Sequence, residues 1–442
     1  MTVAVLMGRG VEGCGVTKNV VEFQKLMGVK VYATMDKVWP RQNSMEFDVN
    51  YFRGADWSDI SKSTKKFPDL MTCTEVIDEI NECEALIVFS VPSKNHPEQC
   101  VDNFIELLKK INVKKSIVQV DHNIQSIHRN AKLKEVLECL DVIMTHATTN
   151  PFSKWCEKEN ISVPITTAGV GYNFDEGKEK YWQPIEEQEK IIRWVGRSAG
   201  WKGPQQLIDF HQEKMMDRGF ITILEGLEAS IGYKGILYKN DKDPSTRWNV
   251  VNKFRPEKEY DETGKFEYGE EELNKGAYLY PGYQHHDMML RMAKSMFGSD
   301  LYHLKPEQYG ANIEYCHADC LGAGTVPIFH EHFGAHIIHN KIGDPVIACE
   351  NSGTVFLTDN FKQRNYGADA HKVALINHEY TAVADTLSML STNHSKRDEE
   401  RHKAFEFWKS HCDAIDVYSD IVSKTKAVHQ KEKASDLESF FA

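Results

Sequence analysis

The stretch LMGRGVEGCGVTKNVVEF, residues 6–23, joins an apolar run to a segment of helical spacing through a turn rich in glycine. Residues 3–7 predict a short strand, and residues 16–27 carry apolar side chains at the intervals of one helix face. The turn is not a P-loop, since no Gly-Lys-Ser or Gly-Lys-Thr follows four spacer residues, and it is not a clean G-x-G-x-x-G. Such a junction presents backbone N–H groups to an anion, but an ordinary tight turn accounts for the spacing equally well.

The strand-and-helix alternation continues through the first half of the chain. Continuous apolar runs predict buried strands, and one helix is expected between the second and third of them. The strands are expected at residues 29–34, 85–91, 116–120 and 142–145, and the helix at residues 98–111. This βαβ order predicts a doubly wound α/β domain.

The pattern restarts in the second half with a strand at residues 191–195 that ends at Gly196. Residues 240–282 are polar, charged and rich in turn residues, which is typical of an insertion or long excursion. Further strands or helical spacing are expected at residues 221–224, 235–237, 288–296, 323–329 and 346–350, and a charged helical tail from residue 396. We therefore predict domains at 1–175 and 176–395, with the tail at 396–442 packing back on the first.

Composition narrows the class of protein. The 442 residues are long for one core, and 41% hydrophobic with 27% charged residues is typical of a globular protein. No apolar run reaches the roughly 20 residues of a membrane span, and residues 3–7 are too few for a signal peptide. Ten scattered cysteines favour reduced thiols, and a net charge of −12 argues against indiscriminate nucleic-acid binding.

Two cations follow the second glycine turn, in GRSAGWKG at residues 196–203. Arg197 and Lys202 have the right chemistry for one diphosphate, with Arg as a fork and Lys as a point charge. The alternative is that both are ordinary solvated cations of a loop. A glycine turn after the first strand of the same chain makes this alternative less favoured.

Acidic side chains precede a run of small residues in EYCHADCLGAGTVPIF, residues 314–329. A carboxylate from Glu314 or Asp319 suits sugar hydroxyls, although a solvated acid near a helix start is an equal alternative. Cys316, His317 and Cys320 suggest zinc, but no second ligand pair with the required spacing exists, so we expect no metal site.

A third polar junction lies in VQVDHNIQSIHRN, residues 118–130. Asp121 and His122 follow the predicted strand end, where an Asp either stabilises positive charge or serves as a helix N-cap. The densest basic region of the chain surrounds them, and a solvated helix face or a DNA phosphate footprint explains it. The candidate DNA-binding residues are His128, Arg129, Lys132, Lys114 and Lys115.

Taken together, these motifs are similar to those of a known family. The chain resembles the DNA α-glucosyltransferases of T-even-type phages in MGRGVEGCGVTK, SVP (90–92), DH (121–122), RWVGR…WKG (193–203), EGLE (225–228), MLRMAKSMFG (289–298) and EY.H…GTVP, in order, to about residue 327. The resemblance implies a GT-B fold of two Rossmann-like domains. It also implies a retaining enzyme that moves a sugar from a UDP-sugar to 5-hydroxymethylcytosine in duplex DNA, in the cytoplasm of the infected host.

The resemblance assigns roles to individual residues. Asp121 and His122 are expected at the reacting centre, and Asp319 at the ribose hydroxyls, where the family has the longer Glu. No cofactor beyond the UDP-sugar is required; Mg²⁺ is compatible, although no motif implies it. The chain is expected to act as a monomer. The donor-binding residues are then Gly13, Gly15, Val16, Lys18, Val120, Arg197, Lys202, Glu225, Glu228, Glu314 and Asp319.

Val120 departs from the family, which has a His before the Asp-His pair. A Val cannot hydrogen-bond the 6-hydroxyl of a hexose, so we expect a UDP-pentose donor, with arabinose favoured because some related phages carry arabinosylated cytosine. The alternatives are UDP-glucose, with Val120 simply packed, and a GT-B enzyme acting on a glycan or small molecule. A non-catalytic nucleotide- or DNA-binding module is less favoured, since motifs occur in both halves.

Overall fold

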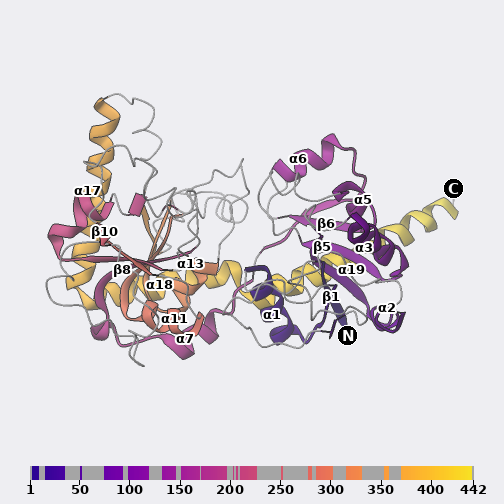
Figure 1. The fold of residues 1–442 in the computed structure, drawn as a ribbon, viewed down its shortest axis with the longest axis horizontal. Helices are drawn as coiled ribbons and strands as arrows, with labels where there is room; N and C mark the ends of the chain where they lie inside the picture. The colour runs from indigo at the N-terminus through magenta and orange to yellow at the C-terminus, as the bar shows by residue number, and fades with distance from the viewer. Residues whose placement is uncertain are drawn as a thin grey trace. The chain divides into compact units, whose positions relative to one another are not determined.

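The structure is a computed structural model of the 442-residue chain. Its strands and helices form two compact units, each built on one parallel sheet (Figure 1). Residues 1–173 and 412–442 contribute to the first unit, and residues 174–304 and 313–411 to the second. The structure describes residues 2–8, 15–34, 50–51, 74–92, 98–118, 132–145, 151–169, 171–196, 203, 206–207, 210–225, 250–251, 277–280, 285–301, 315–330, 353–357 and 370–440.

The first sheet has seven parallel strands in the order β3-β2-β1-β4-β5-β6-β7. Its central strands are almost entirely apolar, because a parallel sheet is covered on both faces. The strands are β1 (Val3–Met7), β2 (Lys30–Ala33), β3 (Asn50–Tyr51), β4 (Ala85–Ser90), β5 (Lys114–Val118), β6 (Val142–Thr145) and β7 (Ile165–Thr167).

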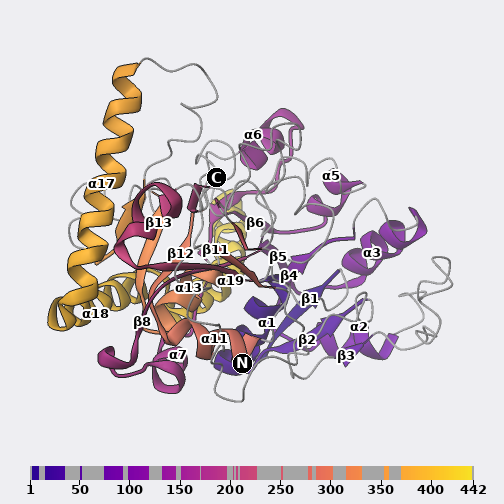
Figure 2. The same cartoon turned by 60° about the vertical axis from the view of Figure 1, so that its left-hand side comes forward.

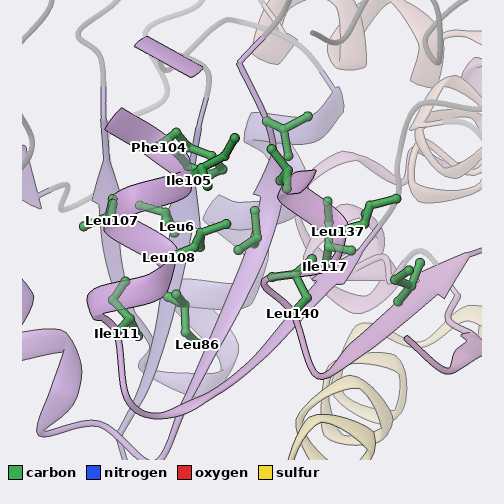
Figure 3. Packing of buried hydrophobic residues seen from close by; sticks show 14 of the residues in the cluster. Leu6, Leu86, Phe104, Ile105, Leu107, Leu108, Ile111, Ile117, Leu137 and Leu140 are labelled. Carbon is green, nitrogen blue, oxygen red and sulfur yellow. The ribbon is translucent and has the colours of Figure 1, made fainter. Parts of the chain in front are cut away.

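Helices cover both faces of this sheet. On one face, Phe104 and Leu108 of α3 pack against Leu6 and Leu86 of the strands (Figure 3). Burying each such side chain contributes about 1.5–3 kcal/mol. The helices of this unit are α1 (Gly15–Met27), α2 (Thr74–Asn81), α3 (Glu98–Lys110), α5 (Leu133–Leu137), α6 (Pro151–Lys158) and α19 (Ala414–Phe440).

The opposite face is covered by α1 and by α19, the last helix of the chain. Tyr418 of α19 stacks on Phe23 of α1, with ring centroids 4.4 Å apart, and its hydroxyl donates to the Asn19 carbonyl at 3.0 Å. The Ser116 and Thr425 hydroxyls meet at 2.8 Å in the buried layer between α19 and β5. The C-terminal helix is therefore part of the core of the first unit.

The second sheet also has seven parallel strands, in the order β10-β11-β9-β8-β12-β13-β14. Strand β8 is central, and its Ile192 and Trp194 are fully buried. The strands are β8 (Glu189–Val195), β9 (Ile221–Glu225), β10 (Val250–Val251), β11 (Ala277–Tyr280), β12 (Ser295–Asp300), β13 (Val326–His330) and β14 (Val355–Leu357).

Three short helices lie side by side against this sheet in both views (Figures 1 and 2). Their apolar residues, Met288 and Cys320 among them, share one buried cluster with Val195 at the end of β8. The helices are α7 (Phe174–Tyr181), α11 (His285–Ala293) and α13 (Tyr315–Gly322). On the other face, α17 (Ala370–Thr392) packs its Tyr380 and Leu387 over the strands, and α18 (His394–Cys412) follows it.

Two expectations about the chain's elements need correction. The region 240–282 is not merely an excursion, since its described residues include β10 and β11, which extend the second sheet beyond β9. Strand β5 begins at Lys114, two residues earlier than expected, so Lys114 and Lys115 are strand residues. The strands expected at 235–237 and 346–350 lie outside the described residues.

Candidate functional site

Each sheet has a topological switch point, where the order in which strands are added to the sheet reverses. In the first sheet the chain leaves β1 toward β2 and β3, then returns to β4 on the other side; in the second it leaves β8 toward β9 and returns to β12. Open parallel sheets bind ligands outside the carboxyl ends of the strands at such points. The two glycine turns singled out in the sequence follow β1 and β8, the first strands at these points.

Gly8 brings the ends of β1 and β4 together. Its N–H donates to the Ser90 carbonyl at 2.9 Å, and a Cβ on Gly8 would collide with that oxygen and lie 2.9 Å from the Phe104 ring. Only glycine, which has no Cβ, allows β1 and β4 to come this close at their ends. Helix α1 begins at Gly15, and Val16 and Lys18 are half-buried in its first turn. These three predicted donor-binding residues thus lie at the N-terminus of the helix after β1.

Gly203 closes the second glycine turn against the strand on the far side of the direction change. Its φ of +66° lies in the left-handed region, and a Cβ there would be 2.7 Å from the Leu301 carbonyl oxygen. Leu301 comes directly after β12. The turn that begins after β8 therefore ends beside β12, at the position where this fold class holds its ligand.

A buried charge cluster lies at the carboxyl end of β9. The Glu225 carboxylate accepts from Arg193 Nη1 at 2.6 Å and from Arg291 Nε at 2.9 Å, with a closer contact to Arg291 Nη2. Arg193 Nε also donates to the Ser295 hydroxyl at 3.1 Å. The exposed fractions of the three charged side chains are 1%, 0% and 4% for Arg193, Glu225 and Arg291.

This cluster changes the interpretation of Glu225. We expected the side chain to line the donor site, but a carboxylate with no exposed surface and both oxygens hydrogen-bonded has no face to offer a ligand. A buried charge needs partners of this kind. In this structure the Glu225 side chain joins β9 to β8 and α11.

A second polar pair links α11 to α13. Nε2 of His285, the first residue of α11, lies 3.0 Å from Oδ1 of Asp319, whose side chain is only 8% exposed. Next to it, the Tyr181 hydroxyl lies 3.0 Å from His286 Nδ1. Burial raises the pKa of Tyr181, and the nearby Asp319 carboxylate adds to that shift. The predicted ribose ligand Asp319 is therefore held at the junction of α7, α11 and α13.

The three residues that suggested zinc are packed inside the second unit. Cys316, His317 and Cys320 are buried on α13, and the His317 ring meets Phe329 at 4.3 Å in an edge-to-face arrangement. Within the described ranges, no group of three or more His, Cys, Asp or Glu side chains is arranged to hold a metal ion. Also within those ranges, no helix is long and apolar enough to cross a membrane.

The described members of the basic cluster have partners within the chain. Lys115 Nζ donates to the Ile111 carbonyl at 2.7 Å, just beyond the end of α3, and burial lowers its pKa. Lys114 lies 3.4 Å from Asp141, and Lys132 lies 2.5 Å from Asp102. DNA binding by these three lysines remains a prediction, and any such role would compete with these contacts.

The remaining site predictions lie outside the described residues, and the structure adds nothing about them. Sequence reasoning in turn missed His285, Arg193 and Arg291, because each gains its meaning from a partner distant in sequence. The one available signal was the position of Arg193 inside an apolar run, where a charge requires burial with a partner. The predictions outside the described residues are Gly13, Val120, Asp121, His122, His128, Arg129, Arg197, Lys202, Glu228 and Glu314.

Comparisons with known proteins extend across both units. A profile of a family described as DNA alpha-glucosyltransferase matches residues 27–368. The chain is 26% identical over 447 residues to the DNA alpha-glucosyltransferase of Enterobacteria phage T4, covering 96% of this chain and 100% of that protein.

Solved structures show the same fold. An alpha-glucosyltransferase in complex with UDP and a 13-mer DNA containing a HMU base matches with a TM-score of 0.74 and 24% identity, over 96% of this chain and 99% of that one. An alpha-glucosyltransferase in complex with UDP-glucose and DNA containing an abasic site matches with a TM-score of 0.73 and 24% identity, over the same shares. The GT-B class expected from the sequence is confirmed.

Proposed function

Because this chain belongs to the DNA alpha-glucosyltransferase family, we propose that it transfers glucose from UDP-glucose to the hydroxymethyl group of 5-hydroxymethylcytosine in duplex DNA, in the cytoplasm of an infected bacterium. The chain is a glycosyltransferase of the GT-B fold. The observation that carries the proposal is the family match over residues 27–368, which includes strands of both parallel sheets. The phage T4 relative, matched over its whole length, supports DNA as the acceptor.

Glucose replaces the pentose favoured on sequence grounds. The comparisons name glucose: the relatives are alpha-glucosyltransferases, and one solved complex holds UDP-glucose. The argument for arabinose rested on Val120 alone, which lies outside the described residues. A packed Val120 with the 6-hydroxyl bonded by another group is compatible with a glucose donor. The pentose becomes the competing outcome of the experiment below.

The residue types at the site suit departure of UDP. Negative charge grows on the diphosphate as the glycosidic bond breaks, and Arg197, Lys202 and the N-terminus of α1 are groups that stabilise it. The sugar becomes oxocarbenium-like, and a carboxylate such as Asp121 stabilises that cation. His122 lies next to it in sequence and is proposed for the same centre. An acceptor base that lies within the stack has to leave it for the reaction, so the proposal includes base flipping.

Mass spectrometry of nucleosides tests the proposal directly. The protein is incubated with duplex DNA containing 5-hydroxymethylcytosine and, in parallel, with UDP-glucose or UDP-arabinose. We expect a hexose mass increment on hydroxymethylcytosine, none on a matched duplex with unmodified cytosine, and almost none with Asp121→Asn. This variant retains the shape of the side chain and removes its charge.

Other results would revise specific parts of the proposal. A pentose increment in place of a hexose would restore the Val120 argument and keep the DNA acceptor. UDP release from UDP-glucose that DNA does not stimulate would favour a glycan or small-molecule acceptor. Donor binding without transfer to any of these acceptors would identify a binding module and overturn the catalytic proposal.

A further inference from the structure

We infer that His285 is a positioning residue that orients the Asp319 carboxylate toward the ribose of the nucleotide donor. The inference rests on the proposed function, which supplies the UDP donor, and on the ribose role that the family resemblance predicts for Asp319. It is carried by the 3.0 Å contact between His285 Nε2 and Asp319 Oδ1.

The contact has the geometry of a specific hydrogen bond at a half-covered site. Asp319 is the fifth residue of α13, beyond the first turn of the helix, and its helix neighbours Ala318 and Cys320 are buried. A carboxylate that is 8% exposed needs hydrogen-bond donors from within the chain. The imidazole of His285 supplies one, and it is itself 33% exposed, at the border between the packed helices and the surface.

The helix that carries Asp319 is fixed in place. Gly322 at the end of α13 is so close to α7 that a Cβ on Gly177 would lie 2.8 Å from the Gly322 Cα. On its other side, a Cβ on Gly298 of β12 would lie 2.6 Å from the Cys320 sulfur. Because glycines permit these approaches, α13 packs closely against α7 and β12, and this packing holds the backbone that carries Asp319.

The helix that carries His285 is equally fixed. Met288 and Met292 of α11 are fully buried in the cluster shared with α7 and α13, and Arg291 pairs with Glu225 on β9. The next residue, His286, meets the Tyr181 hydroxyl from α7. His285 therefore extends from a backbone anchored on three elements, which is the arrangement that a positioning residue requires.

Asp319 is shorter than the Glu that the family has at this position, and this difference explains why a partner such as His285 matters. Asp places its carboxylate one methylene nearer the helix than Glu does, so its oxygens have less reach toward a ligand. A hydrogen bond that fixes one oxygen also fixes the plane of the carboxylate, and so the direction in which the group accepts from ribose hydroxyls. Charge-assisted hydrogen bonds of this kind are among the stronger polar contacts in proteins.

Calorimetric titration with UDP and with 2′,3′-dideoxy-UDP isolates the effect on the ribose. We expect the full-length wild-type chain to bind UDP more tightly than the dideoxy analogue by about tenfold or more. His285→Ala should weaken UDP binding by about tenfold and leave the dideoxy analogue almost unchanged. His285→Gln should keep most of the preference for UDP, since the Gln amide places an N–H donor near the position of Nε2.

His286→Gln is the matched control, because it alters the neighbouring imidazole, which contacts Tyr181 and not Asp319. It should keep the preference for UDP over the dideoxy analogue. The inference would be overturned if His285→Ala lost the same affinity for both ligands or kept the full preference for UDP. It would also be overturned if the His286→Gln control lost as much of that preference as His285→Ala. A wild-type chain that binds no UDP would instead overturn the proposed function, which separates the two failures.

Discussion

Arg193 and Glu225 lie on neighbouring parallel strands with their charged atoms 2.6 Å apart and almost no exposed surface. In the register of β8 and β9, Arg193 is opposite Ile223, so Glu225 is two residues further along its strand and on the same face of the sheet. Because Arg291 joins them from α11, one carboxylate holds a strand, its neighbour and a helix together.

Glu225→Gln should destabilise the protein by about 3–5 kcal/mol, since it leaves two buried guanidinium groups without their anion. The matched control is Asp385→Asn, which breaks the surface pair between Asp385 and Arg218, where the Asp385 side chain is 63% exposed. That variant should cost about 1 kcal/mol or less. Thermal unfolding followed by circular dichroism measures both; similar shifts in the two variants would refute the structural role given to Glu225.

Gly177→Ala and Gly322→Ala should differ although the two glycines face each other. A Cβ on Gly177 would lie 2.8 Å from the Gly322 Cα, whereas a Cβ on Gly322 meets its nearest atom at an ordinary 3.4 Å. We expect Gly177→Ala to cost about 1–3 kcal/mol through overpacking of α7 on α13. Gly322→Ala should be neutral or slightly stabilising, because alanine reduces the entropy of the unfolded chain. Equal melting temperatures would contradict this asymmetry.

His211 should make the second unit sensitive to acid. Its ring is fully buried with Nδ1 at 2.9 Å from the Thr222 hydroxyl, and burial lowers its pKa to about 4. The unfolded chain takes up the proton near its ordinary pKa of about 6.5, so stability is complete above that pH and falls as the pH drops toward 4. The full loss is about 3 kcal/mol.

Melting temperatures measured from pH 7.5 to pH 4.5 test the role of His211. His211→Gln, which cannot titrate, should lose less stability over this range than the wild-type chain. Carboxylates titrate in both proteins, so the difference between the two curves isolates the imidazole. Parallel curves would show that His211 is not the group responsible.

Lys115→Met tests the predicted DNA contact of Lys115 against its contact within the chain. The Nζ of Lys115 donates to the Ile111 carbonyl, so its loss should cost about 1 kcal/mol of stability. Arg129→Ala, by contrast, should reduce the slope of log affinity against log salt by about 0.9 if Arg129 contacts one phosphate. Anisotropy titrations of labelled hydroxymethylcytosine duplex across a salt series compare the two variants. A reduced slope for Lys115→Met would confirm the predicted DNA contact of Lys115, and an unchanged slope would assign this lysine to the fold alone.

The central strands of both sheets could be predicted because each is a continuous apolar run in the sequence. The run ALIVFS forms β4 and VIMT forms β6 where the apolar pattern placed them. The edge strand β10 and its neighbour β11 could not be found in this way, because they lie in a charged region and β10 has only two residues. Pairing with a neighbouring strand, and not local composition, makes them strands.

The site was predictable only in part for the same reason. The glycines after β1 and β8 are visible in sequence, and Gly8 and Gly203 do lie at the two points where the chain changes direction. The contact of His285 with Asp319 joins residues 34 positions apart, and that of Arg193 with Glu225 joins residues 32 apart. No spacing rule for a helix or strand extends over such distances. The first contact comes from the packing of α11 beside α13, and the second from the pairing of β8 with β9.

The return of α19 to the first sheet has a consequence for biosynthesis. Ala414, Val417, Tyr418 and Ile421 belong to the buried cluster that also contains Val5 and Phe23. A ribosome makes these residues after every described strand of both sheets. The first sheet thus has one apolar face incompletely covered until α19 has been made, and a nascent chain halted before residue 414 would present that face to chaperones and proteases.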